Sequence, residues 1–276
     1  MIDLHTHSTH SDGTLTPAEL VAAAAAAELS AVALTDHDTI SGVPELLAAG
    51  RGSAVRTIGG VEISAEFAAG GMHLLGYGFR IGDPGLEDLL RQMRAGRTAR
   101  NQEILARLAA RGMPLEWADV AALAGGEVVG RPHVAQAMVA HGYVRDSDEA
   151  FAHWLARGRP AYAPRFRPMP EEAVKIIAAA GGAPVLAHPV SLNVNKSELV
   201  SWVRRLREVG LRGIEAHHPE HAPSARTAFA KLAADHGLVA TGGSDFHGAR
   251  KPAIRLGRGF GDLRVPEDAL SRLLGE

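Results

Sequence analysis

The chain has 276 residues, of which 46% are hydrophobic and 22% charged, so its composition predicts a packed globular core rather than disorder. The formal net charge is −2, and no block of Lys or Arg is present, which argues against sequence-independent binding of duplex DNA but not against binding of a short nucleotide or a strand end. The absence of cysteine excludes a disulfide scaffold, a zinc ribbon and a thiol nucleophile. With no apolar segment of membrane-spanning length and no basic leader, we expect a cytoplasmic protein without a membrane partner.

Short apolar segments that predict buried strands alternate with segments that predict helices. The first helix is expected to begin at Pro17, with Thr16 as its N-cap and Glu19 completing a capping box. Further helices are expected at 170–180 and 196–210, and strands at 31–35, 55–63, 72–79, 184–187, 213–216 and 238–241. This alternation predicts an α/β fold with a parallel sheet closed as a barrel.

The middle of the chain follows a different pattern. From about residue 83 to residue 158 the strand signal disappears, and helices are expected at 86–112 and 131–142. We therefore expect a barrel made of residues 1–82 and 159–276, with a small helical insertion, residues 83–158, that covers the active site.

Titratable side chains follow the predicted strands. His5 and His7 would point to the same face of a strand, where two imidazoles can chelate a metal ion, although one of them could instead be a hydrogen-bonded core histidine. Asp36, His37 and Asp38 come directly after the apolar strand at 31–35, where buried polar groups are costly unless they bind something. A helix cap beside an exposed histidine is the alternative, and it is plausible for Asp38 but less so for His37.

The same feature recurs along the chain. Glu62 and His73 lie inside predicted strands, His188 ends another, and Asp245 and His247 follow the last one. A buried carboxylate needs a cation or a shifted pKa. Each position alone is ordinary, but their repetition at successive strand ends indicates one shared metal-binding cavity.

In this order, the motifs HxH with a following Asp, TDHD, GxE, HxxG, AHP and SDFH resemble the PHP (polymerase and histidinol phosphatase) family of metal-dependent phosphoesterases. The similarity covers the whole chain. The succession LTDHDT, GVEIS and HLLG, with Gly130-Arg131-Pro132-His133 in the insertion, is most similar to the branch that includes RNase AM and the 3′,5′-nucleoside bisphosphate phosphatases.

This resemblance implies a distorted seven-stranded β/α barrel that holds three divalent metal ions. By it, the first ion would be bound by His5, His7, Glu62 and Asp245, the second by Glu62, His73 and His188, and the third by Asp12, His37 and His247. Imidazole and carboxylate ligands suit Mn²⁺, Fe²⁺ or Zn²⁺ better than Ca²⁺, and ligand type does not choose among those three. We expect Mn²⁺.

Further residues are expected to act on the substrate. Glu62 would bridge two ions, and Asp36 would fix the tautomer of a ligand histidine. Proton transfer to the leaving group is expected from His218 or His221 in the stretch 215–221, and substrate contacts are expected from Arg131, His133 and His217; the sequence does not separate the roles of the three histidines in that stretch.

The expected substrate is the 3′-phosphate of a nucleoside 3′,5′-bisphosphate such as pAp, together with the 5′ end of short RNA. One departure bears on it: in this branch the AHP motif is often followed by Gly-Arg-Tyr, whereas here Val190-Ser191-Leu192 follows. A histidinol-phosphate-type phosphatase and a non-catalytic nucleotide- or metal-binding module are the alternatives.

Overall fold

Seven strands lie in the sheet in the same order in which they follow one another along the chain. The computed structural model describes residues 1–68, 71–124 and 126–276. The strands are β1 (Ile2–Asp3), β2 (Ala31–Leu34), β3 (Arg56–Ala65), β4 (Met72–Tyr77), β5 (Ala183–Leu186), β6 (Gly213–His217) and β7 (Val239–Gly242). All six expected strands are present, and β1 is an additional short one.

The expectation of a parallel sheet is wrong at one strand. β1, β2 and β3 are parallel, and so are β5, β6 and β7, but β4 runs antiparallel to both of its neighbours. The link between β3 and β4 is too short for the helical crossover that a parallel pair requires, so the chain reverses direction instead.

The sheet curls until its first and last strands meet. Leu4 N donates to Gly242 O at 3.2 Å, and Asp245 N donates to His5 O at 2.8 Å. These hydrogen bonds at the ends of β1 and β7 give the nearly closed, seven-stranded barrel that the resemblance implies.

Helices cover the outside of this barrel: α1 (Pro17–Ala26), α2 (Val43–Gly50), α7 (Pro170–Ala179), α8 (Lys196–Glu208), α9 (Pro223–Asp235) and α10 (Asp268–Leu274). Two short 3₁₀ helices, η2 (Pro189–Leu192) and η3 (Gly248–Arg250), follow β5 and β7. The expected capping box at α1 is confirmed, because Glu19 N donates to Thr16 Oγ1 at 3.2 Å and Thr16 N donates to Glu19 Oε2 at 2.8 Å.

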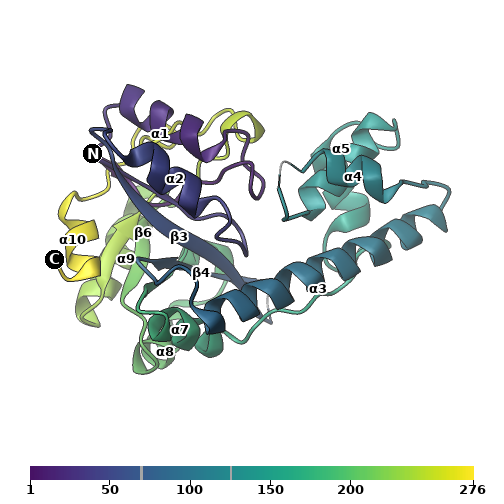
Figure 1. Ribbon diagram of the computed structural model, residues 1–276. Coiled ribbons are helices and arrows are strands. Elements are labelled where there is room, and N and C mark those ends of the chain that lie inside the picture. Colours follow the sequence, from purple (N-terminus) through teal and green to yellow (C-terminus); the bar gives the residue numbers. More distant parts are fainter. Residues whose placement is uncertain (69–70, 125) are drawn as a thin grey trace.

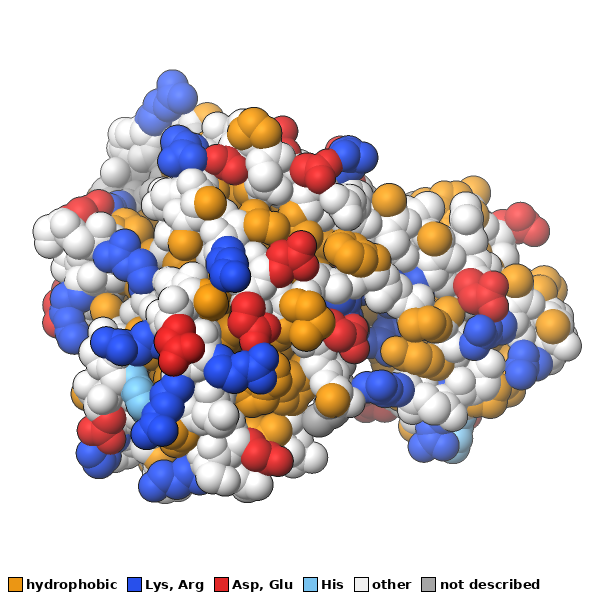
Figure 2. All heavy atoms as spheres, turned by 90° about the horizontal axis from the view of Figure 1, so that it is seen from below, with side chains coloured by type: hydrophobic (Ala, Val, Ile, Leu, Met, Phe, Trp, Pro, Cys, Tyr) orange, Lys and Arg blue, Asp and Glu red, His pale blue; other side chains and the backbone are white. Residues whose placement is uncertain are grey.

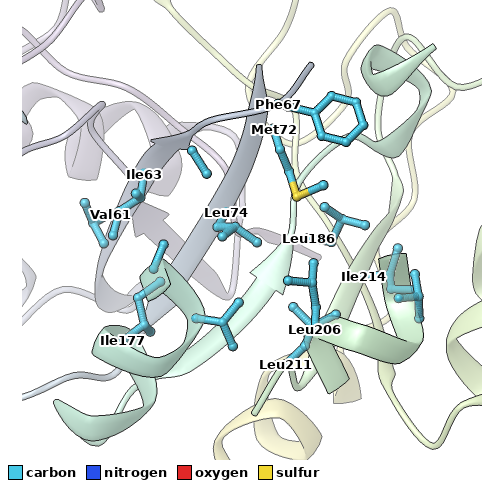
Figure 3. Packing of buried hydrophobic residues seen from close by; sticks show 14 of the residues in the cluster. Val61, Ile63, Phe67, Met72, Leu74, Ile177, Leu186, Leu206, Leu211 and Ile214 are labelled. Atoms are coloured by element: carbon cyan, nitrogen blue, oxygen red, sulfur yellow. The ribbon is translucent and has the colours of Figure 1, made fainter. Parts of the chain in front are cut away.

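The largest apolar core lies between the sheet and the helices on one side of it. Figure 3 shows Ile63 and Leu74 on adjacent strands, with Ile177 of α7 and Leu206 of α8 facing them. Burying such side chains contributes roughly 1.5–3 kcal/mol each. The strands are thereby held rigidly, which fixes the positions of the residues at their ends.

A second group of helices projects from the barrel at the end of the long helix α3 (Pro84–Ala109), as Figure 1 shows. It contains α4 (Trp117–Ala122), α5 (Arg131–Ala140), α6 (Ser147–Ala150) and a π-helical turn, η1 (Phe151–Leu155). In the space-filling view of Figure 2 this part forms a smaller lobe beside the barrel, and acidic and basic side chains are interspersed on both lobes.

Two separate apolar cores meet along α3. Its first half, including Leu86 and Met93, packs into the core of the barrel, whereas Ile104 and Leu108 belong to the core of the smaller lobe. Packing therefore divides the two lobes within α3, rather than at residue 83 where the helix begins. Among the described residues, we find no helix that combines the length and the apolarity needed to cross a membrane.

Candidate metal centre and active site

Histidine and carboxylate side chains from almost every strand converge at one end of the barrel. His5 and His7 follow β1, His37 follows β2, His188 follows β5, and Asp245 and His247 follow β7. The parallel strands place their carboxyl ends there. His73 is the second residue of β4 and reaches the same end because that strand runs in the opposite direction.

His5 and His7 lie in an extended segment just beyond β1 rather than within a strand. Their side chains nevertheless point to the same side, as strand-like alternation requires. His7 Nε2 lies 3.2 Å from Glu62 Oε2 and 3.1 Å from Asp245 Oδ1, and His5 Nε2 lies 3.3 Å and 3.5 Å from the same two oxygens. These four side chains surround one point.

Glu62 is the central residue of the cluster. Its Oε2 lies 3.0 Å from His37 Nδ1, and its Oε1 lies 2.6 Å from His73 Nδ1 and 3.1 Å from His188 Nε2. One carboxylate thus faces histidines with both of its oxygens, which is the geometry of a bridging ligand.

A third group forms around Asp12. His247 Nε2 lies 3.3 Å from Asp12 Oδ1, while His37 Nε2 and His7 Nδ1 each lie 3.9 Å from a carboxylate oxygen of Asp12. His7 and His37 therefore each belong to more than one group. The three groups share side chains, as the ligand sets of adjacent metal ions do.

Three sets of ligand atoms each lie within 4.8 Å of one another: His5, His7, Glu62 and Asp245; His37, Glu62 and His73; and His7, Asp12, His37 and His247. All nine residues expected as ligands thus lie at this one site, His188 through its contact with Glu62. Within the described part of the chain, several of their buried atoms lie close to the facing side chains without hydrogen-bond geometry, namely His7 Nε2, Asp12 Oδ1, His37 Nδ1 and His73 Nδ1. Nitrogen and oxygen atoms that face one another at short range without forming hydrogen bonds fit bound cations.

The electrostatics of the cluster also favour positive charge at its centre. Burial alone would lower the pKa of His5, but the carboxylates of Glu215, Glu62 and Asp245 raise it well above its ordinary value. Burial would raise the pKa of Glu62, yet the histidines around it, led by His37, hold that pKa well below its usual range. Ionised carboxylates are therefore retained in a buried place, where a cation stabilises them.

Glu215 on β6 was not among the expected site residues. It is fully buried, its Oε1 lies 2.9 Å from His5 Nδ1, and its Oε2 accepts a hydrogen bond from His188 N at 2.8 Å. Glu215 therefore fixes the tautomer of His5 and leaves Nε2 of that ring free to face the cluster. The sequence signal was available, because Glu215 is a carboxylate within an apolar strand, as Glu62 is.

Asp36 has a different environment from the one expected. Its Oδ1 accepts from Ser8 N at 2.8 Å and its Oδ2 from Ser8 Oγ at 2.6 Å, and Ser11 Oγ donates to it as well. Ser11 Oγ in turn lies 3.5 Å from His7 Nδ1. The link between Asp36 and a ligand histidine thus passes through a serine, and the direct carboxylate–histidine contact belongs to Glu215.

The three histidines of the stretch 215–221 lie in three different environments. His218 lines the cavity in front of the cluster, with Nε2 at 3.8 Å from Asp245 Oδ2 and its ring 5.3 Å from that of His188. His221 is buried behind it, where Nδ1 bonds to Ala216 O at 2.8 Å. His217 is the last residue of β6, at an irregularity in the pairing with β7, and is absent from the cavity lining.

Two cavities adjoin the cluster. The wider one, of about 530 Å³, is lined by cluster residues, by Arg250 and Lys251 after β7, and by Gln136 and Phe151 of the smaller lobe. The narrower one, of about 170 Å³, lies between the cluster and α3. Both are bordered by Asp12, His37, His73, Pro132 and Phe151. The cluster thus lies where the two cavities meet.

The narrower cavity is strongly basic. We call its basic lining the arginine pocket: Arg97, Arg100, Arg131, Arg165, Arg167 and His133. Nε and Nη2 of Arg100 are buried without a hydrogen-bond partner among the described residues. Burial first, and then the positive charges of Arg97 and Arg165, lower the pKa of Arg100 to about 8. Because a guanidinium group resists deprotonation, this surplus of buried positive charge fits an anion such as phosphate.

The two expected substrate contacts of the insertion lie in this pocket. Arg131 donates from Nη1 to Leu155 O at 3.0 Å, and its guanidinium carbon lies 5.7 Å from the ring centre of Phe151. His133 is buried, its Nδ1 accepts from Gly130 N at 2.9 Å, and its Nε2 has no partner in the part of the chain that the structure describes. Arg97, Arg100, Arg165 and Arg167 were not expected from the sequence, because arginines spread over a helix and a loop are typical of a solvated surface.

The barrel and the carboxylate–histidine cluster define a metal-dependent hydrolase of the class that acts on phosphate esters. Residues 3–114 match the PHP domain model. The chain is 34% identical to the 3′,5′-nucleoside bisphosphate phosphatase of Chromobacterium violaceum, over 89% of this chain and 87% of that protein. It is 36% identical to the 5′-3′ exoribonuclease Rnm of Salmonella typhimurium, over 93% of this chain and 88% of the other.

Among solved structures, one assigned as a metal-dependent phosphoesterase from Bifidobacterium adolescentis superposes with a TM-score of 0.87. It shares 31% sequence identity, and the match covers 99% of this chain and 95% of that one. The protein belongs to the PHP family, as the order of its motifs predicted. It is a hydrolase of phosphate esters.

Proposed function

We propose that the protein removes the 3′-phosphate from nucleoside 3′,5′-bisphosphates such as pAp, and that the same site trims 5′-phosphorylated RNA from its 5′ end. The observation that carries this proposal is the arginine pocket beside the carboxylate–histidine cluster. The two sites suit a substrate that carries two phosphate groups, one held by the arginines and the other hydrolysed at the cluster.

We assign three divalent metal ions, with Mn²⁺ preferred, to the nine expected ligands. His5, His7, Glu62 and Asp245 would hold the first, Glu62, His73 and His188 the second, and Asp12, His37 and His247 the third. Divalent ions in such sites activate water and neutralise charge on a phosphoryl group. The remaining steps of the mechanism depend on the chain's own residues.

The arginine pocket would hold the 5′-phosphate. A phosphate group there would contact Arg100, whose unpaired N–H groups need an acceptor, and would reduce the repulsion among the neighbouring guanidinium groups. We assign Arg131 and His133 to the same anion, with Arg131 oriented by Leu155 O and the ring of Phe151. The fixed distance between pocket and cluster would place the 3′-phosphate for hydrolysis.

The wider cavity would hold the group attached to the far side of the phosphate that is hydrolysed, such as the next nucleotide of an RNA chain. Its volume of about 530 Å³ exceeds what one phosphate group needs and lies in the range of small-molecule sites. A second nucleotide of an RNA chain could lie there, with Phe151 available for stacking. Hydrolysis of a monoester and hydrolysis of the first phosphodiester bond would then be the same reaction with a different group in this cavity.

We assign proton transfer to the leaving 3′-oxygen to His218. It is buried, it lines the wider cavity, and its Nε2 has no hydrogen-bond partner among the described residues. A histidine in such a position can protonate an alkoxide. His221 packs behind it, at a ring distance of 5.3 Å, and would orient it. We assign no substrate contact to His217.

Neither alternative explains the arginine pocket and the ligand set together. A histidinol-phosphate-type phosphatase acts on a single phosphate group and gives no reason for a second, strongly basic cavity. A non-catalytic module would not need all nine ligand positions to carry competent residues.

The deciding experiment compares substrates that differ by one phosphate group. Protein purified without added metal would be analysed for bound metals, and kcat/KM would then be measured with Mn²⁺ for pAp, 3′-AMP, histidinol phosphate, and RNA oligomers with and without a 5′-phosphate. We expect pAp to exceed 3′-AMP by about 100-fold, the value of a bidentate charged contact. Equal rates for pAp and 3′-AMP, or a preference for histidinol phosphate, would refute the proposal.

A further inference from the structure

Asp38 is anchored beside the central carboxylate of the cluster. It is fully buried, and its backbone lies in the left-handed region with φ of 54°. Asp38 N donates to Glu62 O at 2.9 Å, and Asp38 Oδ1 accepts from Ser64 N at 2.9 Å. This conformation is uncommon for non-glycine residues, and at Asp38 the two hydrogen bonds to β3 hold it in place. Asp38 is thus held to the same stretch of β3 that carries Glu62.

The other side of this carboxylate binds the arginine pocket. Asp38 Oδ2 accepts from Arg97 Nε at 2.7 Å and lies 3.1 Å from Arg165 Nη2. Arg97 belongs to α3, the helix that leads from the barrel to the smaller lobe, and Arg165 belongs to the segment that leads back. One barrel carboxylate therefore holds both chain segments that connect the two lobes.

We propose that Asp38 is a positioning residue that sets the distance between the metal-binding cluster and the arginine pocket, and thereby selects substrates whose two phosphate groups are separated by one nucleoside. This inference rests on the proposed function. Asp38 contacts the strand that carries Glu62 on one side and two arginines of the pocket on the other, so it couples the positions of these two parts directly. Since ion pairs in a buried place are stiff, the distance between the two sites is fixed before substrate binds.

Asp38→Asn tests this role, because the amide keeps the shape of the side chain and loses the charge that orients the arginines. We expect kcat/KM for pAp to fall at least about tenfold more than kcat/KM for 3′-AMP, mainly through KM, with unchanged metal content. Asp36→Asn is the matched control. Asp36 is an equally buried carboxylate two residues away whose hydrogen bonds go to Ser8 and Ser11. Its substitution should change both substrates by the same factor.

Equal losses on pAp and 3′-AMP in Asp38→Asn would overturn the positioning role and leave the proposed function standing. A wild-type enzyme that does not prefer pAp over 3′-AMP would overturn the proposed function, and this inference with it. Should Asp38→Asn fail to fold, Asp38→Glu carries the same test. It keeps the charge but displaces the arginines by about one methylene group, so a pAp preference unchanged within about twofold would refute the inference.

Discussion

The carboxylate–histidine cluster and the arginine pocket differ in how their buried charges are balanced. In the cluster at the barrel end, carboxylates and histidines alternate, and Glu62 alone faces five imidazole rings within 3.3 Å. In the arginine pocket, Asp38 is the carboxylate that pairs with Arg97 and Arg165, while Arg100 has N–H groups without a partner among the described residues. The first region suits cations and the second suits an anion, so each is completed by a different ligand.

The origin of the two regions explains this difference. The cluster is built on the ends of strands whose positions a large apolar core fixes. The arginine pocket lies where α3 passes between two apolar cores, between Met93 and Ile104, so polar side chains can be buried there without displacing apolar ones. Catalytic geometry thus depends on the barrel, and substrate selection depends on how the second lobe is attached to it.

The largest effect is expected from Glu62→Gln. An amide cannot bridge two cations as a carboxylate does, so metal ions should be lost and kcat/KM for every phosphate ester should fall by about 1,000-fold, which corresponds to several kcal/mol of lost charge stabilisation. Metal analysis together with steady-state rates on pAp and 3′-AMP checks this. Glu220→Gln is the control, because Glu220 lines the same cavity outside the three ligand sets. Retention of full metal content by Glu62→Gln would contradict the assignment.

His218→Asn should impair the chemical step at the cluster and leave the binding of the 5′-phosphate in the arginine pocket unchanged. Losing a proton donor lowers kcat by about 100-fold, and the loss should be equal for pAp and 3′-AMP because both release a 3′-oxygen. His217→Asn is the neighbouring control and should change kcat less than about twofold, since His217 lies outside the cavity lining. The rates of the two variants, measured with saturating metal, separate the roles that the sequence left open. A larger loss in His217→Asn would reverse the assignment.

The sequence predicted the carboxylate–histidine cluster better than the arginine pocket, because only the cluster leaves a repeated local pattern along the chain. A polar residue at the end of an apolar strand, such as His37 or His188, stands out against its neighbours, and repetition along the chain points to one site. Arg97 and Arg165 are 68 residues apart by their numbers and become neighbours only through the return of the chain to the barrel. Nothing in their local sequence distinguishes them from surface arginines.

One question that the sequence left open and one wrong expectation have local causes. Period-two alternation along β6 would place Glu215 and His217 on the same face, but the pairing of β6 with β7 is irregular between them, and it is His218 that lines the cavity. The antiparallel direction of β4 was missed because an apolar strand carries no sign of its direction; only the short link after β3 indicates it.

Arg100→Met should have opposite effects on stability and on substrate binding. Removing a buried, incompletely paired cation should stabilise the free protein by about 1 kcal/mol and raise KM for pAp by about 30-fold, with little change for 3′-AMP. Denaturant unfolding and steady-state kinetics measure the two effects. Sulfate should stabilise the wild-type protein against unfolding more than it stabilises the variant, because an anion that binds the folded state raises its stability. A variant that is both less stable and equally selective would show that Arg100 has a purely structural role.

The smallest effect is expected from the pH dependence of His133. Burial, followed by the positive charge of Arg250, lowers the pKa of His133 from 6.5 to about 4. Protonation of Nδ1 would also break the hydrogen bond that Gly130 N donates to it. The unfolded chain therefore binds this proton more readily than the folded one, so the stability that the neutral ring contributes is complete above about pH 6.5 and is lost as the pH falls toward 4.

Between about pH 7.5 and about pH 5, metal-free wild-type protein should lose about 1–2 kcal/mol more stability than His133→Gln, which cannot titrate there. Denaturant midpoints at the two pH values measure this difference. Parallel losses in the two proteins would mean that His133 is protonated in the folded state, and the pocket would then hold one more positive charge than its geometry indicates.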